Sequence, residues 1–170
     1  MEGGSAIPPQ VPAAHRIHLD TCYVRPVLLD WDQDPDALDA ARGLVYGSAA
    51  GSLAVSLPSL GEVLVTALRE PFGRSLGRTD PLQRARELVH QGRIGICGFG
   101  THQSDSGYLE CVNELRTADY ELETSDALIV SAALCCSECD QFYTNDGAIL
   151  RSRVIRKAAD DRNVRIINPS

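Results

Sequence analysis

The chain has 170 residues, 44% of them hydrophobic, and a formal net charge of −7. This length is sufficient to bury the core of one domain of ordinary size. The acidic balance excludes a protein whose overall charge attracts polyanions, and no apolar run approaches the roughly 20 residues of a membrane-spanning helix.

The first 15 residues combine small residues and prolines, without a basic start followed by an apolar run. They are predicted to form a flexible N-terminal tail rather than a signal peptide, followed by a single domain over residues 16–170. In the absence of a secretory segment, the six cysteines are expected to be reduced thiols in the cytoplasm.

Short apolar segments alternate with helical patterns along the rest of the chain. Strands are predicted at residues 16–20, 52–56, 93–99, 141–145 and 164–168. Helices are predicted at residues 34–51, 58–68, 81–92, 105–115, 124–136 and 148–161. The helix at 124–136 is apolar almost all round, with Thr124 or Ser125 as its N-cap, which indicates a buried helix. The alternation of strands and helices predicts a parallel, doubly wound α/β sheet.

Four carboxylates occupy positions that this sheet should bring together. Asp20 ends the first strand, and Asp146 directly follows the fourth. Asp126 begins the apolar helix, and Glu62 lies among leucines and valines in the helix after the second strand. Ligands of such sheets bind at the carboxyl ends of the strands. Acids that share a crevice repel one another unless protons or cations intervene, and oxygen ligands suit Mg²⁺ or Mn²⁺.

Each acid also has a simpler interpretation. Asp20 could cap the next element, and Asp126 could favour the helix dipole. Asp146 could belong to a turn in the sequence TNDG, and Glu62 could point outward from an imperfect apolar stripe. A shared site is favoured because all four simpler interpretations would otherwise have to coincide.

The charges are also unevenly distributed. Six aspartates and one arginine lie between Asp20 and Asp39, whereas six arginines lie between Arg69 and Arg93. An acidic zone beside a basic stretch suits a centre that holds cations, with a rim that holds phosphates. A solvated surface is the simpler interpretation of any one stretch.

Four motifs resemble those of the PIN-domain nucleases. They are IHLDTCYV, VSLPSLGEVL, SDALIVSAAL and QFYTND, in the family's order, and the resemblance extends from about residue 16 to 168. It implies a three-layer α/β/α PIN-like fold with a central parallel sheet of four to five strands. It also implies Mg²⁺- or Mn²⁺-dependent hydrolysis of phosphodiester bonds in single-stranded or structured RNA.

The resemblance further assigns roles to residues. Asp20, Glu62, Asp126 and Asp146 would be the catalytic, metal-holding acids, and Thr21 and Thr144 would orient them or bind phosphate. Many small relatives are VapC-type toxins, so an antitoxin protein and a homodimer are the implied partners; other relatives process RNA. Cys22 stands where a serine or another small residue is commoner, and the loop after the Glu62 helix is longer than in compact toxins. In that loop Arg69, Arg74 and Arg78 are predicted to contact RNA.

Competing motifs are weaker. Cys136 and Cys139 form a CxxC at the far end of an apolar helix, the wrong pole for a redox pair, and the other cysteines are scattered. These cysteines are therefore interpreted as small buried hydrophobic residues. Two classes remain open: a metal-dependent ribonuclease, and a catalytically inactive PIN-like scaffold that binds RNA or protein. The presence of all four acids favours the first.

Overall fold

The structure, a computed structural model, describes residues 16–30, 32, 34–69, 80–97 and 105–169. Its strands are β1 (Arg16–Leu19), β2 (Leu53–Ser56), β3 (Gly95–Cys97), β4 (Cys139–Tyr143) and β5 (Arg165–Ile167). All neighbouring strands pair in parallel, in the order β3-β2-β1-β4-β5. The predicted parallel α/β sheet is confirmed, with five strands.

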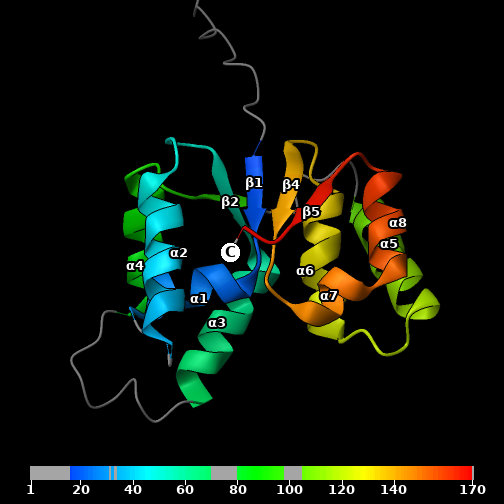
Figure 1. Ribbon diagram of the computed structural model, residues 1–170, viewed down its shortest axis with the longest axis horizontal. Coiled ribbons are helices and arrows are strands. Elements are labelled where there is room, and N and C mark those ends of the chain that lie inside the picture. The colour runs from blue at the N-terminus through cyan, green and yellow to red at the C-terminus, as the bar shows by residue number, and fades with distance from the viewer. Residues whose placement is uncertain (1–15, 31, 33, 70–79, 98–104, 170) are drawn as a thin grey trace, which may run out of the picture.

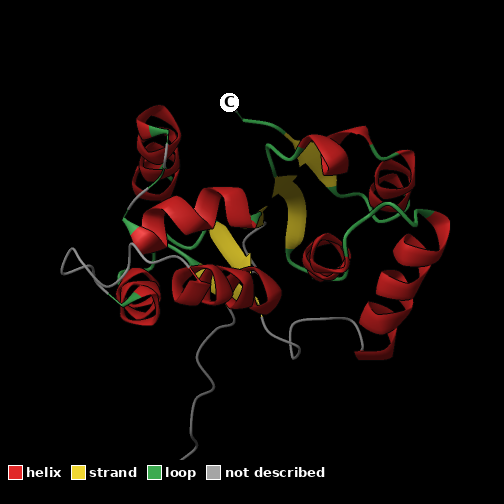
Figure 2. Ribbon diagram, turned by 90° about the horizontal axis from the view of Figure 1, so that it is seen from below, coloured by secondary structure: helices red, strands yellow, loops and turns green. Residues whose placement is uncertain are grey.

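The helices of the described residues follow the strands on both faces. They are α1 (Thr21–Leu29), α2 (Pro35–Gly47), α3 (Leu57–Arg69), α4 (Pro81–His90), α5 (Asp105–Ala118), α6 (Thr124–Leu134), α7 (Gly147–Arg151) and α8 (Arg153–Asp160). Helices α1, α2 and α4 lie on one side of the sheet and α5, α6 and α8 on the other (Figures 1 and 2). Figure 1 shows α1, α3 and α7 gathered at one edge of the sheet, where they follow the carboxyl ends of β1, β2 and β4.

Alternating side chains of the strands supply a separate core for each face. Leu19 of β1 and Val55 of β2 pack with α1, α2 and α4. Phe142 of β4 packs with α5, α6 and α8. Since side chains alternate along a strand, His18 points to the side opposite Leu19, toward α6. The face of β1 that carries His18 therefore lies on the α6 side of the sheet.

Three expectations about the helices were wrong. No helix was predicted at residues 21–29, where α1 contains Pro26. The pattern at 148–161 is two helices rather than one, because Ser152 has an extended backbone and caps α8 by accepting a hydrogen bond from the Ile155 N–H. The cap of α6 is also different, because Glu123 occupies that position without a side-chain hydrogen bond.

The predicted N-terminal tail, residues 1–15, lies outside the described residues. Within the part of the chain that the structure describes, no helix combines the length and the hydropathy needed to cross a membrane.

Candidate active site

The first and fourth strands end side by side, which places Asp20 next to Thr144. Leu19 and Tyr143 are paired in the register of β1 and β4, so the residues after them share the carboxyl edge of the sheet. The Thr144 hydroxyl donates a hydrogen bond to Asp20 Oδ2 at 2.6 Å, and both residues are buried. Strand pairing thus fixes the orientation of the Asp20 carboxylate.

The Asp20 carboxylate is also held by the start of α1. Its Oδ1 accepts a hydrogen bond from the Thr21 backbone N–H at 2.7 Å, and the Cys22 thiol donates to Oδ2 at 3.6 Å. Burial raises the pKa of Asp20, hydrogen bonds from Thr144, Thr21 and Cys22 lower it, and the charge of Asp146 raises it again. Burial, reinforced by the charge of Asp20, raises the pKa of Cys22 to about 12, so this residue stays a protonated donor.

Asp146 is tied to the same hydroxyl. The Asp146 backbone N–H donates to Thr144 Oγ1 at 2.9 Å, so one threonine joins the backbone of this acid to the carboxylate of Asp20. The side chain of Asp146 caps α7, because its Oδ1 accepts the Ala148 N–H at 2.6 Å and the Ile149 N–H at 3.3 Å. The capping interpretation of Asp20 therefore holds, and Asp146 is a helix cap as well rather than only a turn residue. The two caps lie at the same edge of the sheet.

The charges of the other acids act on the pKa of Asp126, which lies in the first turn of α6. Its pKa is raised from 3.8 to about 6, first by burial and then by the charges of Asp146, Asp20, Glu123 and Glu62, in that order. The charges of the other three predicted acids therefore all act on Asp126. Glu123, at the start of the same helix, is a fifth acid that the sequence analysis did not include.

Glu62 acts on Asp126 more weakly than the other acids do. It lies on α3, which packs against both α1 and α6, and it is half-buried rather than fully enclosed by the apolar face expected for it. Its charge is the last-ranked of those that raise the pKa of Asp126. No three of these four acids have potential ligand atoms within 4.8 Å of one another.

The remaining predicted site residues are less constrained. The Thr21 hydroxyl is buried and makes no hydrogen bond within the described structure. Arg69 is the last residue of α3, whereas Arg74 and Arg78 lie outside the described residues. The predicted contacts of these arginines with RNA stay a prediction.

The raised pKa of Asp126 predicts that acid stabilises the metal-free protein. Because the folded state binds this proton more tightly than the unfolded state, the free energy of unfolding should rise as pH falls from about 6 toward 4. Replacing Asp126 with asparagine should remove this part of the pH dependence. Melting temperatures of both proteins at pH 5 and pH 7, without metal, test this; identical pH profiles would show that Asp126 titrates normally.

Thr144 should be a structural link within the site. Thr144→Val leaves the Asp146 N–H and one oxygen of Asp20 without this partner, which should cost about 1–3 kcal/mol of stability. Thr144→Ser keeps the hydroxyl and is the matched control, expected to retain most of that stability. Chemical unfolding of the three proteins measures the difference. A valine variant as stable as the wild type would mean that the hydroxyl contributes nothing.

A second group of potential metal ligands is buried in the core. His18, Cys97 and Cys136 are the one group of three His, Cys, Asp or Glu residues, among those described, whose potential ligand atoms all lie within 4.8 Å of one another. The pKa of the Cys136 thiol is lowered to about 4, first by a hydrogen bond with Cys97 and then by His18. The sequence analysis missed this cluster because its members are far apart in the chain and show no motif spacing.

Comparisons with known proteins bear on the fold. No protein-family model and no curated protein sequence matches the chain. The chain is similar to the crystal structure of FitAcB from Neisseria gonorrhoeae, with a TM-score of 0.51 and 17% sequence identity over 90% of this chain and 97% of that one. It is also similar to FitAB in a structure bound to an IR36 DNA fragment, with a TM-score of 0.48 and 15% identity over 90% of this chain and 94% of that one. With its five-stranded parallel sheet and its likeness to FitAcB, the protein has the PIN-like α/β fold that the sequence motifs implied.

Proposed function

We propose that the protein is a divalent-metal-dependent nuclease that hydrolyses phosphodiester bonds in RNA. The observation that carries this proposal is the link through Thr144, which holds Asp20 and Asp146 together at the carboxyl edge of the sheet. Asp126 lies near them, because its pKa is raised first by burial and then by the charges of Asp146 and Asp20. Carboxylates that repel one another at the edge where α/β sheets bind ligands are typical of a cation site. The choice of RNA as the substrate rests on the sequence resemblance.

The donor set fits Mg²⁺ or Mn²⁺. Asp20, Glu62, Asp126 and Asp146 offer only oxygen, which hard cations prefer. No three of these acids form a group as tight as His18, Cys97 and Cys136, and this openness suits ions that retain several water ligands. Such an ion, when bound, polarises a phosphoryl oxygen and lowers the pKa of bound water.

The residues of the chain have distinct roles in this proposal. Asp20 and Asp146 are held in place by Thr144 and by the helices that they cap, so little reordering is needed to receive a cation. Asp126, in the first turn of α6, would hold the ion together with these two acids. The buried hydroxyl of Thr21 is available to orient a ligand or a phosphate oxygen.

A protein partner is also part of the proposal. Leu57, Val65 and Leu68 are exposed on α3, with 41%, 45% and 85% of their surfaces accessible. Their spacing places them on one face of the helix, and contiguous exposed apolar surface marks interaction sites. An antitoxin or a second copy of the chain would cover this face; an RNA-processing enzyme is the other biological role that the same chemistry allows.

The test is a cleavage assay on purified full-length protein. Single-stranded RNA should be cut in millimolar Mn²⁺ or Mg²⁺, and cleavage should stop when a chelator is added and resume when the metal is restored. The matched control is the Asp126→Asn variant purified in parallel, which detects contaminating nucleases. Metal-dependent RNA binding without cleavage by the wild-type protein would favour the inactive scaffold instead.

A further inference from the structure

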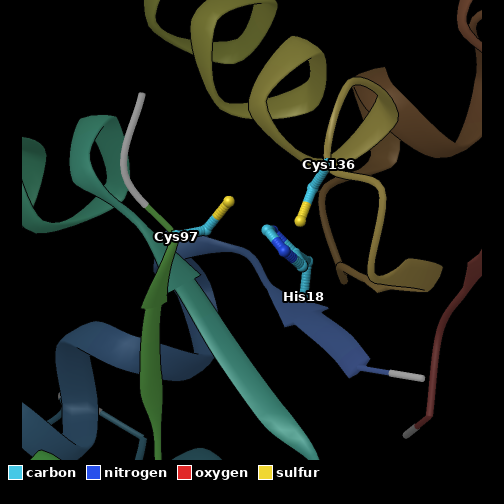
Figure 3. A group of neighbouring side chains, drawn as sticks. All are labelled: His18, Cys97 and Cys136. Atoms are coloured by element: carbon cyan, nitrogen blue, oxygen red, sulfur yellow. The ribbon is translucent and has the colours of Figure 1, made fainter. Parts of the chain in front are cut away.

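Three side chains from separate elements lie close together in the core. His18 comes from β1, Cys97 from the end of β3, and Cys136 from the turn after α6. Figure 3 shows the three side chains directed toward one another. Their potential ligand atoms all lie within 4.8 Å of one another.

Small side chains on strand β2 leave room for these side chains to approach one another. Strand β2 lies between β1 and β3, and its residues Ala54 and Ser56 are paired with the cluster: Ala54 with His18, and Ser56 with Cys97. Both have small side chains, so the imidazole and the thiol can approach each other across the middle strand. A larger residue at position 54 would separate them.

The cluster is closed off from solvent and includes an unpartnered polar atom. His18, Cys97 and Cys136 are 1%, 3% and 5% exposed. His18 Nε2 is buried and has no hydrogen-bond partner within the described residues. Because nearly all buried polar atoms are paired, an imidazole nitrogen in this position beside two thiols suits a bound ion.

We propose that His18, Cys97 and Cys136 form a structural site for a soft metal ion, Zn²⁺ in the first instance. One imidazole and two thiolates are ligands that Zn²⁺ binds in proteins. Ligand atoms around one tetrahedral zinc ion lie roughly 3.5–3.8 Å apart, a separation that this cluster reaches with small side-chain movements. Binding would release the thiol protons and satisfy the buried nitrogen.

This site differs in chemistry and position from the acidic crevice. Thiolates and imidazole select soft ions, whereas Mg²⁺ and Mn²⁺ prefer the carboxylates. His18 lies two residues before Asp20 on β1, and Cys136 follows the helix that begins near Asp126. A bound ion would therefore link β1, β3 and the end of α6 to one another. The inference does not depend on the proposed nuclease activity.

The experiment uses the full-length chain, purified without metal and kept reduced, in millimolar Mg²⁺ so that the carboxylates are occupied. The probes are Zn²⁺ and Co²⁺. We expect one ion per chain, a higher melting temperature, and thiolate-to-cobalt charge-transfer absorption in the near ultraviolet. Cys136→Ser and Cys97→Ser should each weaken binding by more than the roughly 10–100-fold that loss of an outer partner costs.

The controls separate this site from other thiols and from the acids. Cys139→Ser alters a thiol three residues from Cys136, and Cys22→Ser alters the thiol beside Asp20; both variants should bind as the wild type does, as should Asp20→Asn. Circular dichroism confirms folding, and the cobalt spectrum of the wild type reports thiolate ligation even if a serine variant unfolds. A wild-type cobalt spectrum without thiolate bands would overturn the proposal. Binding that survives in Cys136→Ser but is lost in Asp20→Asn would also overturn it.

Discussion

Replacing Glu62 with glutamine should lower RNA cleavage by at least about a hundredfold while leaving the protein folded. Glutamine keeps the shape of the side chain but removes a charge that would hold the cation. Loss of a single charge-stabilising group in an active site commonly costs about 10²–10³ in rate. The metal-free variant should be at least as stable as the wild type, because one of the charges that raise the pKa of Asp126 is removed.

Activity and stability must be measured on the same preparation, since an unfolded variant is also inactive. Glu110→Gln is the matched control, because Glu110 is an exposed acid on α5; it should cleave at the wild-type rate. If Glu62→Gln cut RNA as fast as this control, Glu62 would have no part in the site. An inactive variant that had also lost its structure would indicate that Glu62 is needed for folding.

Millimolar Mn²⁺ or Mg²⁺ should stabilise the wild-type protein substantially. An ion that binds only the folded state adds free energy by mass action, about 2.7 kcal/mol at one hundred times its dissociation constant. The gain should be largest near pH 7, where Asp126 is ionised, and should shrink below its pKa of about 6, where protons compete for the same oxygens. Thermal or chemical unfolding at several metal concentrations measures it.

Sodium chloride at matched ionic strength is the control for general screening, and Asp126→Asn is the control for the site. Both should show much smaller gains. Equal stabilisation of Asp126→Asn and the wild type by Mn²⁺ would place the bound ion away from these carboxylates. No change in either divalent salt would support the inactive scaffold.

The strands and most of the helices could be predicted because local pattern and burial agree there. The segment of β2, Leu53–Ser56, is fully buried and apolar up to its last residue. Helix α6 is apolar on nearly every side, and it packs within the α5–α6–α8 layer. Helix α1 was missed because Pro26 argues against a helix interior. Four other buried side chains on α1 compensate for that residue, and their packing is tertiary information.

The acids of the candidate site were foreseeable because topology places strand ends at one edge. Asp20 and Asp146 needed only the strand order, and their charges do act on Asp126. The link through Thr144 depends on the register between β1 and β4, which no local pattern specifies. The cluster of His18, Cys97 and Cys136 was not foreseeable, because it depends on small residues of the intervening strand β2.

If the four carboxylates form one cation site, the anomalous scattering of manganese in a crystal soaked with Mn²⁺ will locate the ion directly. We expect a peak at the carboxyl edge of the sheet, at bonding distance, about 2.0–2.6 Å, from oxygens of Asp20 and at least one of Asp126 and Asp146. Glu62 should contact the same ion, directly or through a water ligand. Manganese peaks found only elsewhere on the molecule, with none among these carboxylates, would show that the four acids do not form a cation site.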